Sequence, residues 1–237
     1  MKILSQVEKS NSQFGQDAYL FFNVFKYWPM KNRIGFYLDS GANDFKYISN
    51  TWFFDKCLGW RGLCVEPNPQ YHAGLKASRS CTLIPECLSS VKQQVNFQNS
   101  GVSGKVTGEA GSDTLKTQCS PLHDMLSRVN ESSIDLWSLD VEGYELTILR
   151  GVNFSQIPVR VALIEDFWIS GRQLDLHMTT NGFVKYQHLT IDSVFINREF
   201  MKSDFVSTKI WLPKTFNQDL AHENAYRVQH KSSLDCL

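Results

Sequence analysis

The chain has 237 residues, of which 42% are hydrophobic and 13% are aromatic. This length and composition indicate one folded domain and exclude a disordered chain. Basic and acidic side chains number 24 each, and the formal net charge of zero argues against duplex nucleic acid as the main partner, because phosphate binding usually needs a clustered basic excess. The sequence holds no apolar run of the ~18 residues that a membrane span requires. The short, polar residues 1–8 do not indicate a secretory signal.

Helical and strand patterns alternate along the chain. Asn68 followed by Pro69 is a typical helix start, and the glycine-rich residues 99–112 indicate a long loop within the domain. The predicted helices cover residues 16–25, 49–58, 69 onward, 121–129, 144–149 and 174–180, and the predicted strands cover 34–38, 62–65, 81–85, 94–98, 134–139, 159–164, 183–189 and 193–196. Repeated βα units that end in two strands predict an α/β fold, with a mostly parallel sheet and helices on both faces.

Acidic residues follow four of the predicted strands. In an open α/β sheet, ligands bind outside the carboxyl ends of the strands, so we expect these carboxylates to face one crevice. Like charges in one crevice are costly unless a cation or a hydroxyl-rich ligand meets them. As an alternative, each acid caps a helix or lies solvated in a loop. The acids are Asp39, Glu66, Asp140, Glu142, Glu165 and Asp166.

The first two strand ends carry a pattern typical of nucleotide cofactor sites. Gly41, two residues after Asp39, lets the backbone approach a ligand, and Glu66 at the end of the second strand is placed to accept both ribose hydroxyls. The pattern suits NAD as well as S-adenosylmethionine. However, the G-x-G-x-x-G form that cradles a pyrophosphate is absent. This absence favours S-adenosylmethionine, whose positive sulfonium also suits an acidic crevice.

Seven motifs occur in order between about residues 12 and 197. They are SQFGQD at 12–17, LDSGAND at 38–44, SNT at 49–51, LGWRG at 58–62, VEPNP at 65–69, IDLWSLDVEGYE at 134–145 and DSVFI at 192–196. With this set the chain resembles the FkbM-type S-adenosylmethionine-dependent methyltransferases. It departs from the family at Ser40, usually aliphatic, and at Phe45, usually glycine. We therefore expect a single domain over residues 1–237, with its core at about 12–197 and an unassigned extension at 198–237.

The resemblance implies a Rossmann-like class I methyltransferase fold, whose seven-stranded sheet has an antiparallel last strand. It implies methyl transfer from S-adenosylmethionine to a hydroxyl, and we expect that hydroxyl on a sugar of a glycan or glycosylated product. Asp39 is expected near the methionine amino group, Glu66 at the ribose and Cys87 near the adenine. The other expected cofactor residues are Gln16, Asp17, Gly41, Asn43, Ser49, Thr51, Pro67 and Asp140.

A sugar hydroxyl needs a base or a divalent metal to make it a good nucleophile. Asp140, Glu165 and Asp166 are hard oxygen ligands, which suit Mg²⁺ or Mn²⁺ better than zinc. The arrangement is similar to related metal-dependent sugar O-methyltransferases, in which an acid two residues beyond the first ligand is the base. That position is Glu142 here, and His188 is an alternative base. An alternative to the metal hypothesis is that Asp140 caps a helix and Glu165 pairs with a basic residue.

Two other functions stay open on the sequence alone. The chain is a metal-independent methyltransferase of a lipid or polyketide hydroxyl, or it is a non-catalytic interaction module with a methyltransferase-like fold. Trp168 stacks on a sugar face or packs in the core. The six cysteines include no Cys-x-x-Cys pair, which argues against zinc. We expect reduced core thiols and a cytoplasmic location, and the sequence does not indicate the oligomeric state.

Overall fold

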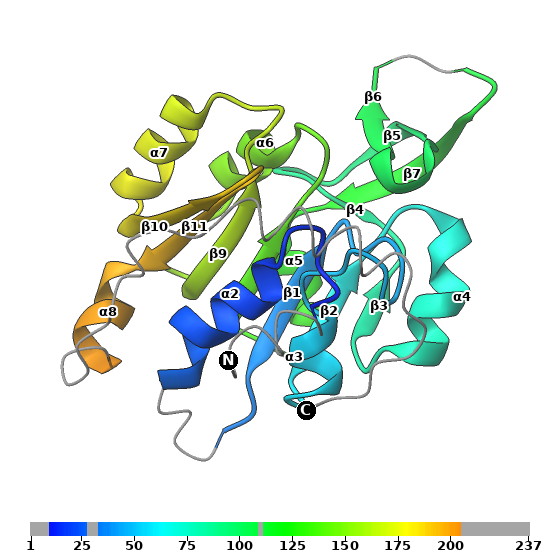
Figure 1. Ribbon diagram of the computed structural model, residues 1–237. Helices are drawn as coiled ribbons and strands as arrows, with labels where there is room; N and C mark the ends of the chain where they lie inside the picture. Colours follow the sequence, from blue (N-terminus) through cyan, green and yellow to red (C-terminus); the bar gives the residue numbers. More distant parts are fainter. Residues whose placement is uncertain (1–9, 28–32, 109–110, 205–237) are drawn as a thin grey trace.

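A seven-stranded sheet organises the part of the chain that the computed structural model describes, residues 10–27, 33–108 and 111–204 (Figure 1). Its strands lie in the order β10-β11-β9-β8-β1-β2-β3. They are β1 (Phe36–Ser40), β2 (Arg61–Val65), β3 (Thr82–Ile84), β8 (Ile134–Leu139), β9 (Val159–Glu165), β10 (Phe183–Leu189) and β11 (Asp192–Asn197). β11 pairs antiparallel with β9 and β10, and the other pairs are parallel. The predicted mostly parallel sheet and its terminal hairpin are confirmed.

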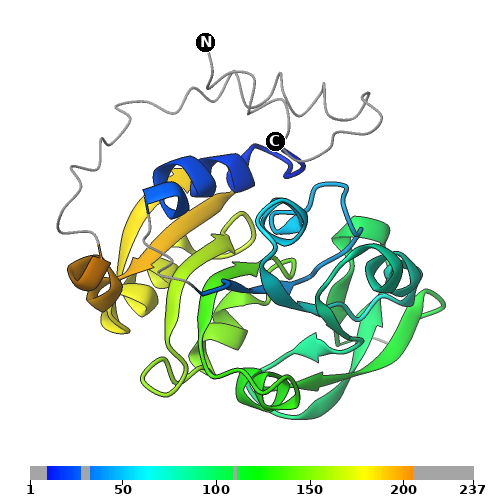
Figure 2. The ribbon, with the colours of Figure 1, turned by 90° about the horizontal axis from the view of Figure 1, so that it is seen from below.

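Helices cover both faces of this sheet, as the βα pattern predicts. One face packs on α2 (Gln16–Asn23), α3 (Trp52–Lys56) and α4 (Pro69–Ser78), and the other on α5 (Leu122–Arg128), α6 (Glu145–Arg150) and α7 (Gly171–Thr180). In Figure 2, α2 in blue and α3 in cyan lie on one side of the strands. Each face of the sheet has its own hydrophobic core, the first under α2, α3 and α4 and the second under α5, α6 and α7. Successive side chains of β1 point to opposite faces, so Tyr37 packs in the first core and Leu38 in the second. A further helix, α8 (Arg198–Asp204), follows β11 and packs Phe200 on the first core.

A second sheet interrupts the βα order between β3 and α5. It has the order β4-β7-β5-β6, and it projects to one side of the main sheet in Figure 1. The sequence predicts only its strand β5 and treats residues 99–112 as a loop. The loop instead contains a short helix and a strand, because Val106 pairs with the buried Phe97 across the two strands. The elements are β4 (Cys87–Leu88), β5 (Gln93–Gln98), η2 (Gly101–Ser103), β6 (Lys105–Thr107) and β7 (Thr114–Ser120).

The prediction of reduced core thiols is wrong. Cys64 on β2 forms a disulfide with Cys81, and Cys87 on β4 forms one with Cys119 on β7. Cys57 is disulfide-bonded as well, and Cys236 lies outside the described residues. Burial in apolar runs cannot distinguish a thiol from half of a disulfide, because both are buried equally well. Such bonds persist in oxidising compartments. No helix in the described ranges has the length and apolar character needed to cross a membrane.

Candidate functional site

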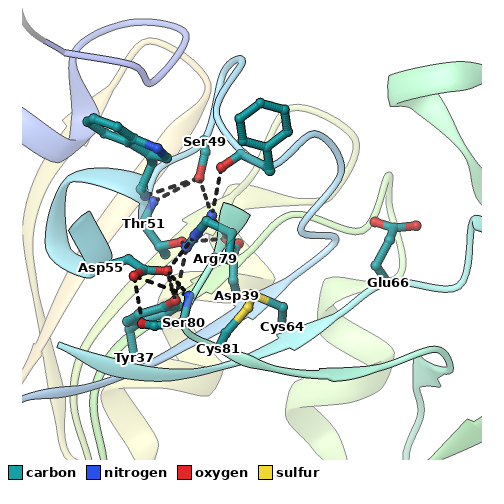
Figure 3. Close-up of a disulfide and its surroundings, with 12 residues drawn as sticks. Tyr37, Asp39, Ser49, Thr51, Asp55, Cys64, Glu66, Arg79, Ser80 and Cys81 are labelled. Carbon is teal, nitrogen blue, oxygen red and sulfur yellow. Dashed lines mark hydrogen bonds and ion pairs between the residues drawn. A yellow bond between two sulfur atoms is a disulfide. The ribbon is translucent and has the colours of Figure 1, made fainter. Parts of the chain in front are cut away.

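Three of the predicted cofactor residues lie around one buried guanidinium, that of Arg79 at the end of α4 (Figure 3). They are Asp39, Ser49 and Thr51. Its side chain is fully buried. Arg79 donates to Asp55 at 2.6 Å, to Thr51 Oγ1 at 2.6 Å and to Ser49 Oγ at 3.2 Å. Thr51 in turn donates to Asp39, whose carboxylate lies 3.9 Å from the guanidinium. We call these five residues the Arg79 cluster.

The Arg79 cluster balances two buried carboxylates with one cation. Burial raises the pKa of Asp39, although Arg79 and Thr51 favour its charged form. Burial also acts to raise the pKa of Asp55, but hydrogen bonds from Ser80 and Arg79 outweigh it and lower that pKa. The side chains of Asp39, Ser49 and Thr51 are therefore occupied in tying β1, α3 and α4 together.

A pocket that is partly open to solvent lies at the carboxyl ends of β1, β2 and β8. The main sheet supplies one wall through Gly41, Glu66 and Asp140, and the second sheet supplies another through Phe97 and Val106. Six of the predicted cofactor residues line it, and so does the predicted base. They are Gly41, Asn43, Glu66, Pro67, Cys87, Asp140 and Glu142.

Backbone amides fix the carboxylate of Glu66 in this pocket. Asn43 N donates to one oxygen at 2.8 Å, and Asn68 N donates to the other at 2.7 Å. Each carboxylate oxygen keeps a second lone pair for another donor. Burial is the largest cause that raises the pKa of Glu66, to about 7. Gly41 has φ +79°, and a Cβ there would lie 1.9 Å from the carbonyl oxygen of Asp140, so only glycine fits between β1 and β8.

Three carboxylates meet beside the pocket, at the ends of β8 and β9. Asp140, Glu145 and Glu165 each offer one oxygen, and these oxygens lie within 4.8 Å of one another. Glu145 Oε1 accepts from the amides of Val141 and Gly143. In contrast, Glu145 Oε2 and Glu165 Oε2 are buried without a hydrogen-bond partner.

The crowding of these groups raises their pKa values. Burial and then the charge of Glu165 raise the pKa of Asp140 well above its ordinary value. Burial and then the charge of Glu142 raise the pKa of Glu165 to about 8. Asp192, which pairs with Glu165 across β11 and β9, has its pKa raised to about 7, chiefly by burial. An arrangement of this kind is suited to hold a cation or a shared proton.

The motif near the N-terminus supports this edge from outside the pocket. Gln16 donates to Asp192 at 2.7 Å. Asp17 accepts from the hydroxyls of Ser10 and Ser12 and from two backbone amides. The Asp17 carboxylate is therefore occupied within its own loop, and neither Gln16 nor Asp17 lines the pocket.

The two predicted bases have different surroundings. Glu142 is partly buried and lines the pocket, with φ +57° in the left-handed region. Burial raises its pKa, although a hydrogen bond from Trp168 acts in the opposite direction. His188 is exposed on β10, and its Nε2 lies 3.1 Å from Asp166. Asp166 also accepts from Ser193, so this predicted metal ligand is not part of the group formed by Asp140, Glu145 and Glu165.

A family model, the Methyltransferase FkbM domain, matches residues 39–201. The chain belongs to the FkbM methyltransferase family. Membership makes it a methyltransferase and implies S-adenosylmethionine as its methyl donor. No curated protein and no solved structure matches the chain.

The sequence of this FkbM methyltransferase did not reveal Arg79 or Glu145 as site residues. Arg79 follows a helix with no motif around it, so only the fold shows that it reaches β1. Glu145 belongs to the DVEGYE motif, five residues after Asp140. That position in the motif was the sequence feature that could have indicated it as a site residue. A turn of positive φ at Glu142 and Gly143 brings Glu145 back beside Asp140.

We predict that Arg79→Met lowers the free energy of unfolding by about 3–5 kcal/mol, because it leaves two buried carboxylates without their cation. Urea denaturation measures the change. The control is Arg61→Met, whose exposed side chain pairs with Glu131 at 2.7 Å and whose loss should cost less than about 1 kcal/mol. Equal losses in the two variants would contradict the role given to Arg79.

Proposed function

We propose that this protein is an S-adenosylmethionine-dependent O-methyltransferase that acts on a hydroxyl of a carbohydrate. The observation that supports this best is the pocket at the strand ends, where Gly41, Glu66, Asp140 and Glu142 lie together. Residues 12–197 form its catalytic domain. The strand order with antiparallel β11 supports the Rossmann-like class I fold that the resemblance implies.

In this proposal the cofactor lies between the two sheets. Glu66 accepts the ribose hydroxyls, and Gly41 and Asn43 let the backbone approach the nucleoside. The apolar residues Leu88, Phe97 and Val102 suit the adenine. Asp140 faces the positively charged sulfonium end. Among the other predicted cofactor residues, Asp39, Ser49 and Thr51 hold the β1 edge through the Arg79 cluster, and Gln16 and Asp17 hold the edge near Asp192.

Methyl transfer is an in-line displacement in which the acceptor oxygen forms a bond to the methyl carbon as the carbon–sulfur bond breaks. The electron pair of that bond stays on sulfur and gives S-adenosylhomocysteine. The acceptor hydroxyl must lose its proton, and Glu142 is placed in the pocket to take it. Its raised pKa makes the carboxylate a stronger base than an ordinary glutamate, which suits proton abstraction. Alignment of the reacting atoms supplies much of the remaining acceleration.

We also propose a divalent metal site, formed by Asp140, Glu145 and Glu165 in place of the predicted set with Asp166. The two orphaned oxygens of Glu145 and Glu165 fit such an ion, because buried carboxylate oxygens need a partner. Hard oxygen donors suit Mg²⁺ or Mn²⁺. A bound ion would lower the pKa of a hydroxyl that reaches it.

The first prediction from this proposal concerns Glu66 and pH. Its ionised form accepts the ribose hydroxyls and its pKa is about 7, so S-adenosylhomocysteine should bind about tenfold more tightly at pH 8 than at pH 6. Glu66→Gln should bind more weakly and lose this dependence, because it has no proton to release. Isothermal titration calorimetry at both pH values measures the affinity. Identical pH profiles for the wild type and Glu66→Gln would contradict the assignment.

The same raised pKa determines the sign of an effect on stability. Folding raises the pKa of Glu66 from 4.5 to about 7, so the folded state binds the proton more tightly than the unfolded state. The stability that this group contributes is fully present below about pH 4.5 and is lost as the pH rises through 7. Glu66→Gln should flatten this part of the pH–stability curve, which chemical denaturation between pH 4 and 8 records.

The second prediction concerns the base. Glu142→Gln keeps the shape of the side chain and removes its basicity, so the single-turnover rate at saturating cofactor should fall by ~10²–10⁴ while cofactor affinity persists. The matched variant His188→Gln should retain most of the rate. A normal rate for Glu142→Gln together with a collapsed rate for His188→Gln would make the His188–Asp166 pair the base.

The third prediction concerns the metal. Glu145→Gln keeps an oxygen for the amides of Val141 and Gly143 but removes the charge, so Mn²⁺ binding should weaken by more than ~10-fold, the scale seen even for partners of metal ligands. Asp166→Asn, which changes the ligand predicted from the sequence but lies outside the proposed set, should bind Mn²⁺ like the wild type. Calorimetry with Mn²⁺ alone measures both. Full activity of the wild type after exhaustive chelation would overturn the metal proposal and favour the metal-independent alternative.

A further inference from the structure

Two large aromatic side chains stand exposed beside the acidic edge. Phe167 and Trp168, in the loop between β9 and α7, are 62% and 60% exposed. Their rings meet edge to face, with centroids 4.7 Å apart. Across the described ranges no other two exposed large hydrophobic residues are neighbours in sequence. An exposed aromatic pair of this kind marks a binding surface more often than an isolated side chain does.

Trp168 is tied to the proposed base. Its indole lies near the Glu142 carboxylate and favours the charged form of that group. Its Cβ lies so near Gly143 that a Cβ on that glycine would approach to 3.2 Å. The ring therefore borders the turn that carries Glu142, and a molecule on the ring would lie next to that carboxylate.

The surroundings of the pair are polar and favour one kind of occupant. Lys105 on β6 and Ser103 in η2 lie near Glu142 and favour its charged form. The chain of a lipid would place methylene groups against these charged and hydroxyl groups and leave them without partners. A sugar ring instead offers an apolar C–H face to an aromatic ring, and hydroxyls at its edge to the polar groups.

We propose that Phe167 and Trp168 form the platform on which the acceptor sugar ring stacks, with the hydroxyl to be methylated directed at Glu142. Phe167 holds the indole ring by its edge-to-face contact, and the close approach of the Trp168 Cβ to Gly143 keeps the residue beside the turn that carries Glu142. This inference rests on the proposed function and identifies the surface that would select a carbohydrate over an apolar acceptor.

The test separates sugar binding from cofactor binding. Methyl glycosides of common monosaccharides are titrated into the protein, with and without S-adenosylhomocysteine, and saturation-transfer NMR records which of them bind. We expect at least one glycoside to bind, and Trp168→Ala to weaken it by about tenfold, equal to about 1.4 kcal/mol. Trp168→Phe, which keeps a ring, should retain much of the affinity. Leu176→Ala, which removes a side chain on α7 that is 69% exposed, is the matched control and should bind like the wild type.

With the acceptor glycoside in a turnover assay, Trp168→Ala should raise KM by about tenfold and change kcat less, while its affinity for S-adenosylhomocysteine stays normal. Equal glycoside binding by the wild type and Trp168→Ala would overturn the platform. It would also be overturned if no glycoside bound, or if a long-chain alcohol bound at Trp168 in their place. Failure of the wild type to bind S-adenosylhomocysteine would refute the proposed function, whereas glycoside binding without cofactor still reports on the platform by itself.

Discussion

The buried guanidinium of Arg79 is the constraint on which the proposed cofactor edge of the sheet depends. It neutralises Asp39 at the end of β1 and Asp55 in α3, while its own backbone ends α4. Burying either carboxylate without this cation would cost several kcal/mol, so the three elements are held in one arrangement. The turn at Gly41 follows Asp39 by two residues, and Glu66 precedes α4 by three. The Arg79 cluster therefore positions Gly41 and Glu66, although none of its own residues lines the pocket.

The opposite side of the pocket is built on unfavourable electrostatics. Asp140, Glu145, Glu165 and Asp192 all have raised pKa values, with burial as the largest cause in each. Arg79 offsets the charge of Asp39 and Asp55, whereas at this edge the neighbouring carboxylates add to one another's charge. A folded state that tolerates such a cost gains from a positive ligand. Both the proposed sulfonium cofactor and the proposed divalent ion have that charge, so the crowding supports the two proposals alike.

Much of the main sheet was predictable, because its strands are short apolar runs that end at Asp, Glu or Gly and its helices have apolar stripes. The acids at the strand ends were predictable for the same reason, since topology alone brings the ends of parallel strands to one edge. The second sheet was not, because the polar residues of β7 alternate weakly and Phe97 and Val106 pair across a glycine-rich turn. The contacts that Asp39 and Asp166 make with other side chains were not predictable either. A motif gives the position of a carboxylate in the sequence. Only the fold shows that Arg79 lies beside Asp39 and that His188 lies beside Asp166.

The disulfides brace both walls of the pocket. The bond between Cys64 and Cys81 spans 17 residues, and that segment carries both Glu66 and Arg79. The bond between Cys87 and Cys119 spans 32 residues and closes the second sheet, of which Cys87 itself lines the pocket. Covalent closure of loops of this length restricts the unfolded chain, and here it also joins the start and the end of each segment that forms a pocket wall. Reduction should therefore loosen the proposed cofactor site before the strands β8 to β11 on the other side of β1, which carry no such bond among the described residues.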